Sequence, residues 1–292
     1  MELSQKLREE LTELGLSADY VLWIAEATIK EDLDGGTDVT SEATIPTHQN
    51  SIAEYRARKA GTIAGLHIAA AVLEVTGITD YTIKVTEGSH VEAGQLILEA
   101  RGNTRALLLS ERTALNFLGG LSGIATLTHR WVEEVKAFPV EIRDTRKTTP
   151  LHRELEKFAV RCGGGVNHRM SLSDAALIKD NHIVAAGGVT QAFQAVKAQY
   201  PDIEVEVEVD ALEQLREVVA AGADLVLLDN MSIEQCRAAV EIVKGATKLE
   251  ASGGLRLENA KAYASTGVDY LAVGALTHSA VVLDIGLDLR MA

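Results

Sequence analysis

The sequence predicts an α/β protein, in which a parallel βα barrel, possibly open or incomplete, follows a sandwich-like α+β N-terminal domain. Three observations support this fold class. Beyond about residue 140, apolar segments alternate with amphipathic segments in units of about 20–25 residues. Residues 52–101 contain stretches with the two-residue alternation of strands. The chain has 292 residues, 47% of them hydrophobic and 24% charged, which is enough for two domains with buried cores.

The N-terminal part is expected to begin with helices and continue with strands. Residues 3–30 have a helical pattern in two segments, and Ser17 is a suitable N-cap for the second. An acidic turn at residues 31–40 follows, and residues 52–101 are rich in strand patterns. Residues 84–100 resemble the turn of a biotinyl- or lipoyl-type sandwich. Because no lysine lies at the hairpin tip, we interpret this region as scaffold.

A further helical stretch leads into the barrel. An apolar helix is expected to begin near Glu111, to be followed by the glycine-containing segment 119–126, and to resume as a helix to about Lys136. We place the domain boundary at residue 115, so that the N-terminal domain is 1–115 and the barrel domain is 116–276. The tail, 277–292, is expected to be short helical or extended structure and to pack on the first domain.

The barrel pattern consists of six strands with helices between them. The strands are expected near Val140–Asp144, Ala176–Lys179, Ile203–Val209, Leu225–Leu228, Leu249–Ala251 and Tyr270–Val273. The helices are expected near Thr190–Tyr200, Ala211–Ala221, Ser232–Val243 and Leu257–Ser265. A right-handed series of such units closes naturally into a barrel, and a doubly wound open sheet is the alternative. No G-x-G-x-x-G motif follows a strand, so a dinucleotide site lacks support.

Polar residues recur at the carboxyl ends of these strands, the edge that forms the active site in barrel enzymes. The strand ends supply cations, carboxylates and glycines: Asp144-Thr145-Arg146-Lys147, Lys179-Asp180-Asn181-His182, Glu208 with Asp210, Asp229-Asn230, Ser252-Gly253-Gly254 and Gly274. Two of the ends are rich in glycine, where a phosphate can approach backbone N–H groups. The pattern therefore predicts a site for a polyanionic substrate with a divalent metal.

The surrounding charge supports a local anion site. The chain carries a formal net charge of −14, yet residues 140–182 hold eight Lys/Arg against six acids. A basic region confined to one part of an acidic chain favours a small anion over a nucleic-acid or membrane surface. Within it, residues 153–161 read as an ordinary amphipathic helix with a solvated charged face.

The segment Ile203–Val209 alternates valine and glutamate. The two-residue period places the valines toward the helices and Glu204, Glu206 and Glu208 inside the barrel. Unpaired charges there are costly, so Lys248 is expected to pair with one of the inner glutamates. We assign Glu204 and Glu206 to an internal ionic network and Glu208, nearest the carboxyl end, to ligand or metal.

Four sequence segments identify a family. D-T-R-K-T-T-P at 144–150, R-C-G-G-G-V-N-H-R-M at 161–170, A-L-I-K-D-N-H at 176–182 and E-R-x-A-L-N with S-G-I-A-T at 111–126 resemble quinolinate phosphoribosyltransferase, a type II phosphoribosyltransferase. The acidic segment 31–40 also fits. In this family the first motif usually continues with Gly and an apolar residue, where this chain has Leu151 and His152. Glycine permits backbone angles that leucine does not, so the loop conformation is open.

The resemblance implies a reaction and roles for the residues. Phosphoribosyl would pass from 5-phosphoribosyl-1-pyrophosphate to quinolinate with decarboxylation, in de novo NAD biosynthesis. Quinolinate would be held by Arg146, His168 and Arg169, together with Arg112 from a neighbouring subunit, and Thr145 would be a further substrate-binding residue. Lys147 and Lys179 would contact the phosphoribosyl substrate, with Lys147, Glu208 and Asp229 as the catalytic set. Glu208 and Asp229 would bind the ribose hydroxyls or Mg²⁺. The phosphate would be bound by Ser252, Gly253, Gly254, Gly274 and His278.

Other readings remain open from the sequence alone. Enzymatic alternatives are a related phosphoribosyltransferase with another aromatic acceptor and an aldolase that forms a Schiff base through Lys147 or Lys179. A non-enzymatic alternative is a regulator that binds a phosphorylated metabolite. The two cysteines, Cys162 and Cys236, form no metal or disulfide pattern. The charged N-terminus resembles no signal peptide, so we expect a cytoplasmic protein without nucleic-acid or membrane partners. The family resemblance implies a homodimer or higher oligomer whose active site is shared across subunits.

Overall fold

The computed structural model describes residues 2–292, which form two compact units. The first unit contains residues up to Leu127 together with Glu154–Gly163 and Ser279–Ala292, and the second contains Thr128–Arg153 and Gly164–His278. The sequence-based boundary at residue 115 therefore differs from this division. The helix α6 (Arg153–Cys162) belongs almost entirely to the first unit.

The second unit is a parallel α/β sheet. Its six strands are β6 (Glu141–Arg143), β7 (Ala175–Ile178), β8 (Glu204–Val209), β9 (Leu225–Asp229), β10 (Lys248–Ser252) and β11 (Tyr270–Ala272). Their order is β6-β11-β10-β9-β8-β7, and every pairing is parallel. In the described chain β6 and β7 are the two edge strands of this sheet. The structure is thus an open barrel, and the predicted strands and alternating helices are confirmed.

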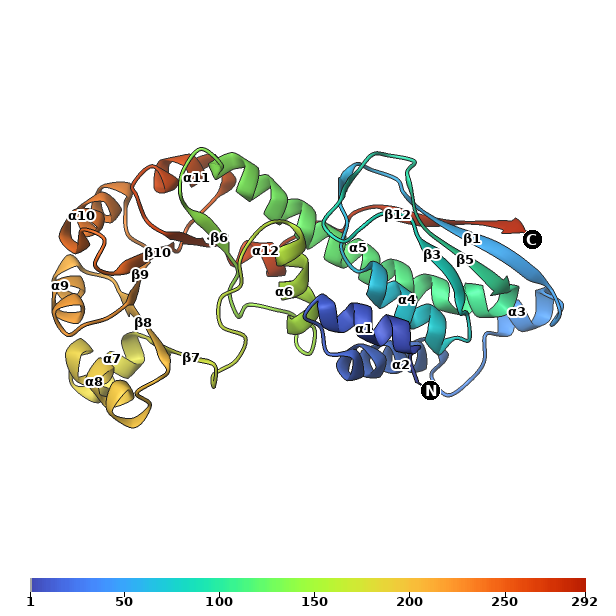
Figure 1. The fold of residues 1–292 in the computed structure, drawn as a ribbon, viewed down its shortest axis with the longest axis horizontal. Coiled ribbons are helices and arrows are strands. Elements are labelled where there is room, and N and C mark those ends of the chain that lie inside the picture. Colours follow the sequence, from blue (N-terminus) through green and yellow to red (C-terminus); the bar gives the residue numbers. More distant parts are fainter. Residues whose placement is uncertain (1) are drawn as a thin grey trace. The chain divides into compact units, whose positions relative to one another are not determined.

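Helices α8 (Val189–Gln199), α9 (Leu212–Ala220), α10 (Ile233–Val243) and α11 (Leu257–Ala264) lie on the outer side of the curved sheet (Figure 1). The unit also contains α7 (Asp180–Ala186) and the short α12 (Ala275–His278). Val205, Val207 and Val209 of β8 are buried, while Glu208 on the opposite face is partly exposed. The inward placement of Glu206 is confirmed, because it is buried, but Glu204 is exposed, so its predicted place in an internal ionic network was wrong.

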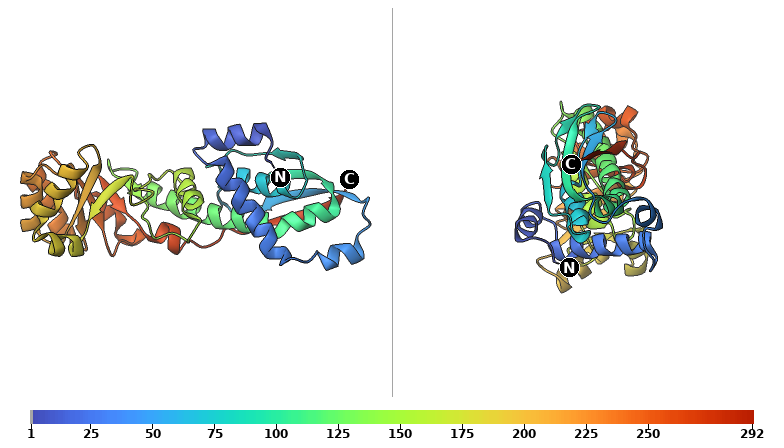
Figure 2. Two further views of the ribbon diagram at one scale, coloured as in Figure 1. Left: turned by 90° about the horizontal axis from the view of Figure 1, so that it is seen from below. Right: turned by 90° about the vertical axis from the view of Figure 1, so that its right-hand side faces the viewer.

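The first unit contains a four-stranded antiparallel sheet and helices (Figures 1 and 2). The sheet has the order β12-β1-β5-β3, formed by β1 (Asn50–Ala57), β3 (Asp80–Ile83), β5 (Leu96–Asn103) and β12 (Ile285–Met291). A second sheet pairs β2 (Gly61–Thr62) with β4 (His90–Val91). The helices are α1 (Gln5–Glu13), α2 (Ala18–Leu33), α3 (Val39–Thr44), α4 (Leu66–Val75) and the first part of α5 (Thr104–Val135). Ser17 caps α2 by accepting from the Tyr20 N–H, as predicted.

The tail supplies the outer strand of the first sheet. β12 pairs with β1 along its whole length, from Ser51 opposite Met291 to Ala57 opposite Ile285. Within the first unit the chain end is therefore tied to the N-terminal sheet by a complete ladder of backbone pairs.

Two local details differ from expectation. The region 52–101 contains strands, as predicted, but also the helix α4, whose ten residues are all buried or nearly so. Only His67 and Glu74 in this helix are polar, so it has no broad polar face and no helical period appears in the sequence. In addition, α5 is one continuous helix, and Gly119 and Gly123 do not interrupt it. A Cβ on Gly123 would collide with the Val281 carbonyl oxygen, and a Cβ on Gly119 would collide with the Val282 side chain. Glycine at these two positions therefore allows the segment 281–283 to pack against the helix.

Candidate active site

A cavity of about 380 Å³ lies at the carboxyl ends of the parallel strands in the second unit. Most of the predicted site residues line it. They are Thr145, Arg146, Lys147, Lys179, Glu208, Asp229 and Ser252 from the strand ends, and His168 and Arg169 from the family motif. The remaining lining is Leu177, Leu227, Glu250 and Ala272. Parallel strands bring their carboxyl ends to one edge, which explains how residues far apart in the chain meet here.

Asp144 fixes the two loops that carry the arginines. This fully buried residue directly follows β6, and its Oδ2 accepts from the Asn167 side-chain amide at 2.6 Å. Its Oδ1 accepts from the His168 backbone N–H at 2.8 Å. The loop after β6 is thereby joined to the loop that precedes β7, and the arginines at 146 and 169 are held on rigid backbone.

Within residues 2–292, neither Arg146 nor Arg169 forms an ion pair with a carboxylate, and together they provide a site for an anion. The Nε atoms of Arg146 and Arg169 are buried and have no hydrogen-bond partner within residues 2–292. Arg169 donates from Nη1 to the Ala175 carbonyl at 2.9 Å, which orients its guanidinium. Burial lowers the pKa of Arg169, and the neighbouring charge of Arg146 lowers it further. Two crowded cations with unsatisfied donors are suited to a ligand that carries carboxylates or phosphates.

The carboxylates predicted for ribose or metal lie in the same cavity. Glu208 Oε2 is 3.2 Å from Lys179 Nζ, and Asp229 Oδ2 accepts from the Asn230 side-chain amide at 2.8 Å. Glu208 and Asp229 lie at the carboxyl ends of the neighbouring strands β8 and β9, and both also line a second cavity beside the first. Oxygen donors on adjacent strand ends fit a hard divalent cation such as Mg²⁺.

The glycine-rich strand ends stand beside the cavity. Ser252 lines it, whereas Gly253, Gly254, Gly274 and His278 are not among its lining residues. Gly253 has a φ of +89°, and a Cβ there would collide with the Asn230 side chain. A Cβ on Gly274 would come within 3.3 Å of His278 Nε2 and 3.2 Å of Lys147 Cδ. The expected phosphate residues are therefore grouped around Asn230 and Lys147, at the ends of β9, β10 and β11.

Arg112 lies elsewhere in this chain. It is on α5 and lines a cavity of the first unit together with Leu115, Asn116 and residues 282–285. It does not line the cavity of the second unit. Its expected contribution from a neighbouring subunit stays a prediction.

The loop in which this chain departs from the family motif has a left-handed backbone at Leu151. Leu151 has a φ of +67°, in the left-handed region that favours glycine, and its side chain is 69% exposed. The chain therefore keeps the glycine-type turn at this position although it has a leucine. The turn also contains a hydrogen bond from the His152 N–H to the Thr149 carbonyl, at 3.0 Å.

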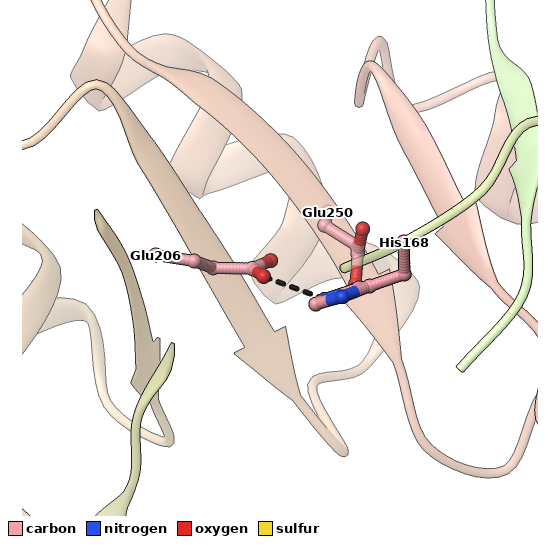
Figure 3. A group of neighbouring side chains, drawn as sticks. All are labelled: His168, Glu206 and Glu250. Carbon is pink, nitrogen blue, oxygen red and sulfur yellow. Dashed lines mark ion pairs between the residues drawn. The ribbon is translucent and has the colours of Figure 1, made fainter. Parts of the chain in front are cut away.

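A buried acidic cluster forms the floor of the cavity, and sequence reasoning assigned it only in part. His168 Nε2 lies 2.7 Å from Glu206 Oε2 and 3.7 Å from Glu250 Oε1 (Figure 3). Arg143 Nη1 donates to Glu250 Oε2 at 2.9 Å, and its guanidinium lies over the Tyr270 ring at 4.7 Å. Glu206 does belong to an internal network, as predicted, but its neighbours are His168 and Arg143.

The predicted role of Lys248 was therefore wrong. Its Nζ donates to the Tyr270 hydroxyl at 3.0 Å, and its side chain is exposed at the amino end of β10. The barrel interior instead takes its cation from Arg143, the last residue of β6. The sequence shows that Arg143 is basic, but the direction of its side chain depends on which strand pairs with β11 at the edge of the sheet.

Ligand atoms of His168, Glu206 and Glu250 lie within 4.8 Å of one another. Such spacing is compatible with a metal, but the guanidinium of Arg143 already binds Glu250 and would repel a cation placed there. We therefore interpret the cluster as a hydrogen-bonded ionic network.

Comparison with known proteins gives consistent results along the chain. Residues 38–122 match the N-terminal domain and residues 124–288 the C-terminal domain of the family described as quinolinate phosphoribosyl transferase. The chain is 50% identical to a nicotinate-nucleotide pyrophosphorylase [carboxylating] from Mycobacterium leprae, over 89% of this chain and 94% of that protein. It is 41% identical to a probable enzyme of the same name from Bacillus subtilis, over 89% and 90%. The solved structure of the nicotinate-nucleotide pyrophosphorylase from Francisella tularensis superposes with a TM-score of 0.89 at 38% identity, covering 93% and 96%.

Proposed function

This chain belongs to the quinolinate phosphoribosyltransferase family, and from that premise we infer that it catalyses the family's decarboxylating transfer. Phosphoribosyl passes from 5-phosphoribosyl-1-pyrophosphate to the ring nitrogen of quinolinate. The products are nicotinate mononucleotide, pyrophosphate and carbon dioxide, and the reaction serves NAD biosynthesis. We assign this reaction to the cavity because the buried Nε atoms of Arg146 and Arg169 have no hydrogen-bond partner within residues 2–292. Two such arginines suit a substrate with two carboxylates.

The arginine side of the cavity would bind quinolinate. Arg146 and Arg169 offer planar guanidinium groups that can each meet a carboxylate through two N–H donors. Thr145 and His168 line the same cavity and complete the acceptor pocket. A monocarboxylate would leave one guanidinium without its partner, and that would weaken its binding.

The lysine side would bind the phosphoribosyl donor. Lys147 and Lys179 provide point charges for the pyrophosphate, and Ser252 with Gly253, Gly254, Gly274 and His278 would hold the 5-phosphate through backbone and side-chain donors. Glu208 and Asp229 would hold the ribose hydroxyls or Mg²⁺. When bound, the metal ion would supply additional positive charge to the leaving pyrophosphate.

The arrangement matches the charges that develop during ribosyl transfer. The sugar carbon becomes positive as its bond to pyrophosphate breaks, and carboxylates beside the ribose stabilise that charge. The departing pyrophosphate becomes more negative, and Lys147 and Lys179 stabilise it. Since the ring nitrogen of quinolinate is itself the nucleophile, the reaction needs no side-chain nucleophile and no Schiff base.

We further propose a dimer in which Arg112 of one subunit completes the cavity of the other. This proposal is supported by the cavity of the first unit that Arg112 lines together with Val282, and by the exposure of Val282 and its neighbour Val281. Apolar residues exposed to this degree, 85% and 65%, are typical of a surface covered by another subunit.

We place the enzyme in the cytoplasm. Over residues 2–292, no helix has both the length and the apolar character needed to cross a bilayer. The proposed substrates are small and charged, and they are consistent with that compartment.

The test is to mix the protein with quinolinate, 5-phosphoribosyl-1-pyrophosphate and Mg²⁺ and to measure nicotinate mononucleotide and carbon dioxide together. Equal amounts of both products, dependent on the metal, are expected. Absence of both from folded protein would redirect the search to other aromatic acids, with pyrophosphate release as the readout. Trapping with borohydride and a carbonyl substrate would reveal an aldolase, and binding of the sugar pyrophosphate without turnover would indicate a regulator.

A further inference from the structure

Arg153 joins the two loops that carry the arginines of the cavity. Its Nε donates to the Thr148 hydroxyl at 3.0 Å, in the loop after β6. Its Nη1 donates to the Met170 carbonyl at 3.0 Å, in the loop that precedes β7. The sequence pattern placed Arg153 on the solvated face of a helix, whereas the structure shows a half-buried side chain that binds both loops. Arg153 is not among the residues that line the cavity, so it can act on a ligand only through these loops.

Each arginine of the cavity lies between two cross-links of the loops. The first cross-link is Asp144, whose carboxylate binds residues 167 and 168. The second is Arg153, which binds residues 148 and 170. Arg146 therefore lies between positions 144 and 148 of one loop, and Arg169 lies between positions 168 and 170 of the other. Two cross-links fix both the distance and the relative rotation of two segments, whereas a single cross-link would leave a hinge.

The two cross-links differ in how strongly they are tied to the core. Asp144 is fully buried directly after β6, so its replacement would disturb the edge of the sheet. Arg153 is the first residue of α6, and a turn with a hydrogen bond from the His152 N–H to the Thr149 carbonyl leads into it. Replacement of Arg153 can therefore loosen the two loops while the buried carboxylate of Asp144 keeps its partners.

The side chains between the cross-links form one anion site. Burial lowers the pKa of Arg169 most and the charge of Arg146 lowers it further, so the two guanidinium groups lie close together. A carboxylate pairs best with a guanidinium when the two planar groups are aligned. Two fixed guanidinium groups therefore fit one spacing of two carboxylates on a rigid ring, and a ligand with another spacing loses one of the pairs.

We propose that Arg153 is a positioning residue that sets the separation of the Arg146 and Arg169 guanidinium groups. The cavity is thereby selective for a ligand whose two carboxylates lie on adjacent ring carbons. Without Arg153 the loops can shift relative to each other, and a ligand with this spacing loses its advantage. This proposal rests on the proposed function, because it concerns how the site assigned to quinolinate selects its ligand.

Binding of two isomeric ring dicarboxylates tests the selection without turnover. Phthalate has its carboxylates on adjacent ring carbons, and isophthalate has them one carbon farther apart. By isothermal titration calorimetry, wild type should bind phthalate about tenfold or more tightly than isophthalate, because a misaligned guanidinium loses a charge-assisted pair. In Arg153→Ala this ratio should fall to about threefold or less, mainly through weaker binding of phthalate. An unchanged ratio, or a wild type that binds both isomers equally, would overturn the proposal.

Thr148→Val keeps the proposal testable if Arg153→Ala does not fold. Valine is similar in size to threonine but cannot accept from Arg153 Nε, while the bond to the Met170 carbonyl remains. The ratio of the two affinities should then fall by about twofold or more, because one of the two bonds of the cross-link is lost. A folded Thr148→Val protein with the wild-type ratio would contradict the assignment.

Arg161→Ala is the matched control. It removes an arginine from the same helix, but this arginine donates to the Leu14 carbonyl within the first unit, at 2.9 Å. Its ratio should equal that of wild type even if its melting temperature falls. The same loss of selectivity in Arg161→Ala and Arg153→Ala would show that the effect follows from a damaged helix, and the positioning role would be rejected.

Steady-state kinetics separates positioning of the arginines from a general loss of structure. Arg153→Ala should raise the KM for quinolinate about tenfold and leave the KM for 5-phosphoribosyl-1-pyrophosphate within about twofold of wild type. The reason is that Lys179, Glu208 and Asp229 lie at strand ends outside the two loops that Arg153 joins. Equal increases in both KM values would contradict the proposal. Failure of the proposed function would appear differently, because wild type would then form no nicotinate mononucleotide.

Discussion

Single side chains in the cavity are held by contacts that do not involve substrate. Asp144 joins two loops, the Ala175 carbonyl orients Arg169, and Thr277 Oγ1 donates to the Lys147 carbonyl at 2.8 Å. These contacts fix the backbone and guanidinium positions before a ligand arrives. Preorganised charge of this kind is the largest contribution that a protein makes to reactions with ionic transition states.

Lys147→Ala tests the role of a cation that is not part of the structural network. The Lys147 side chain extends past Gly274 at the phosphate end of the cavity. We expect turnover to fall by about 100-fold or more, because the pyrophosphate loses a charge that stabilises its departure. The melting temperature should stay within about 2 °C of wild type. Turnover near the wild-type value in steady-state assays would remove Lys147 from the catalytic set.

Leu151 tests the backbone strain in the loop after β6. Leu151→Gly should raise the melting temperature by about 1–2 °C. A left-handed leucine costs about 1–2 kcal/mol, and the greater flexibility of unfolded glycine offsets part of the gain. Leu172→Gly is the matched control, because Leu172 is similarly exposed, at 71%, and does not have a positive φ. Calorimetry should show the control unchanged or lowered, and a lowered value for Leu151→Gly would show that the leucine side chain stabilises the turn.

At the scale of elements, glycines in the long helix α5 allow another segment of the chain to pack closely against it. Leu283 N–H donates to the Gly119 carbonyl at 3.0 Å, and the segment 281–283 passes close to Gly123. This segment leads directly into β12, which completes the sheet of the first unit. The glycines of α5 thus allow the closing segment to reach its strand position.

Gly123→Ala and Gly120→Ala should change stability in opposite directions. Alanine at 123 would collide with the Val281 carbonyl, so we expect a loss of about 1–3 kcal/mol. Alanine at 120 meets nothing within 4 Å and should gain up to about 1 kcal/mol from its higher helix propensity. Denaturant unfolding of both variants measures the difference. Equal changes in the free energy of unfolding would mean that helix propensity, and not the contact with residue 281, determines the effect of alanine at position 123.

At the scale of the whole molecule, the fold gathers cations at one site within an acidic chain. The formal net charge is −14, while the cavity combines the cations Arg146, Lys147, Arg169 and Lys179 with the acids Glu208, Asp229 and Glu250. Excess negative charge elsewhere favours solubility, and the local cations attract anionic substrates. Because that attraction acts between charges in water, substrate affinity should weaken as salt increases.

Complementation tests the proposed dimer. Arg112→Ala and Lys147→Ala should each be nearly inactive alone. If Arg112 acts in the partner's cavity, a mixed dimer has one cavity with both lesions and one with neither. Co-refolded mixtures should then recover about a quarter of wild-type activity, since half of the dimers are mixed and half of their sites are intact. Recovery that does not exceed the sum of the single variants would place Arg112 in the cavity of its own subunit or outside catalysis.

The sequence by itself determined the parallel βα pattern, the polar strand ends and the family, because these depend on local periodicity and short motifs. The residues from Thr145 to Ser252 that were predicted for the site largely do line one cavity, since parallel strands must align their carboxyl ends. The inner face of β8 was likewise predictable from its two-residue period.

Only the tertiary structure decided which charges meet inside the barrel. Arg143 and His168, not Lys248, neutralise the buried acids, because β6 lies beside β11 and brings Arg143 over Tyr270 toward Glu250. The helix α4 and the continuity of α5 were hidden for a related reason. A helix that is apolar at nearly every position and glycines in the middle of a helix have no local signature, and their conformation is set by the surfaces that they pack against. Pairing of buried charges and close packing are properties of neighbours in space, which a linear pattern does not specify.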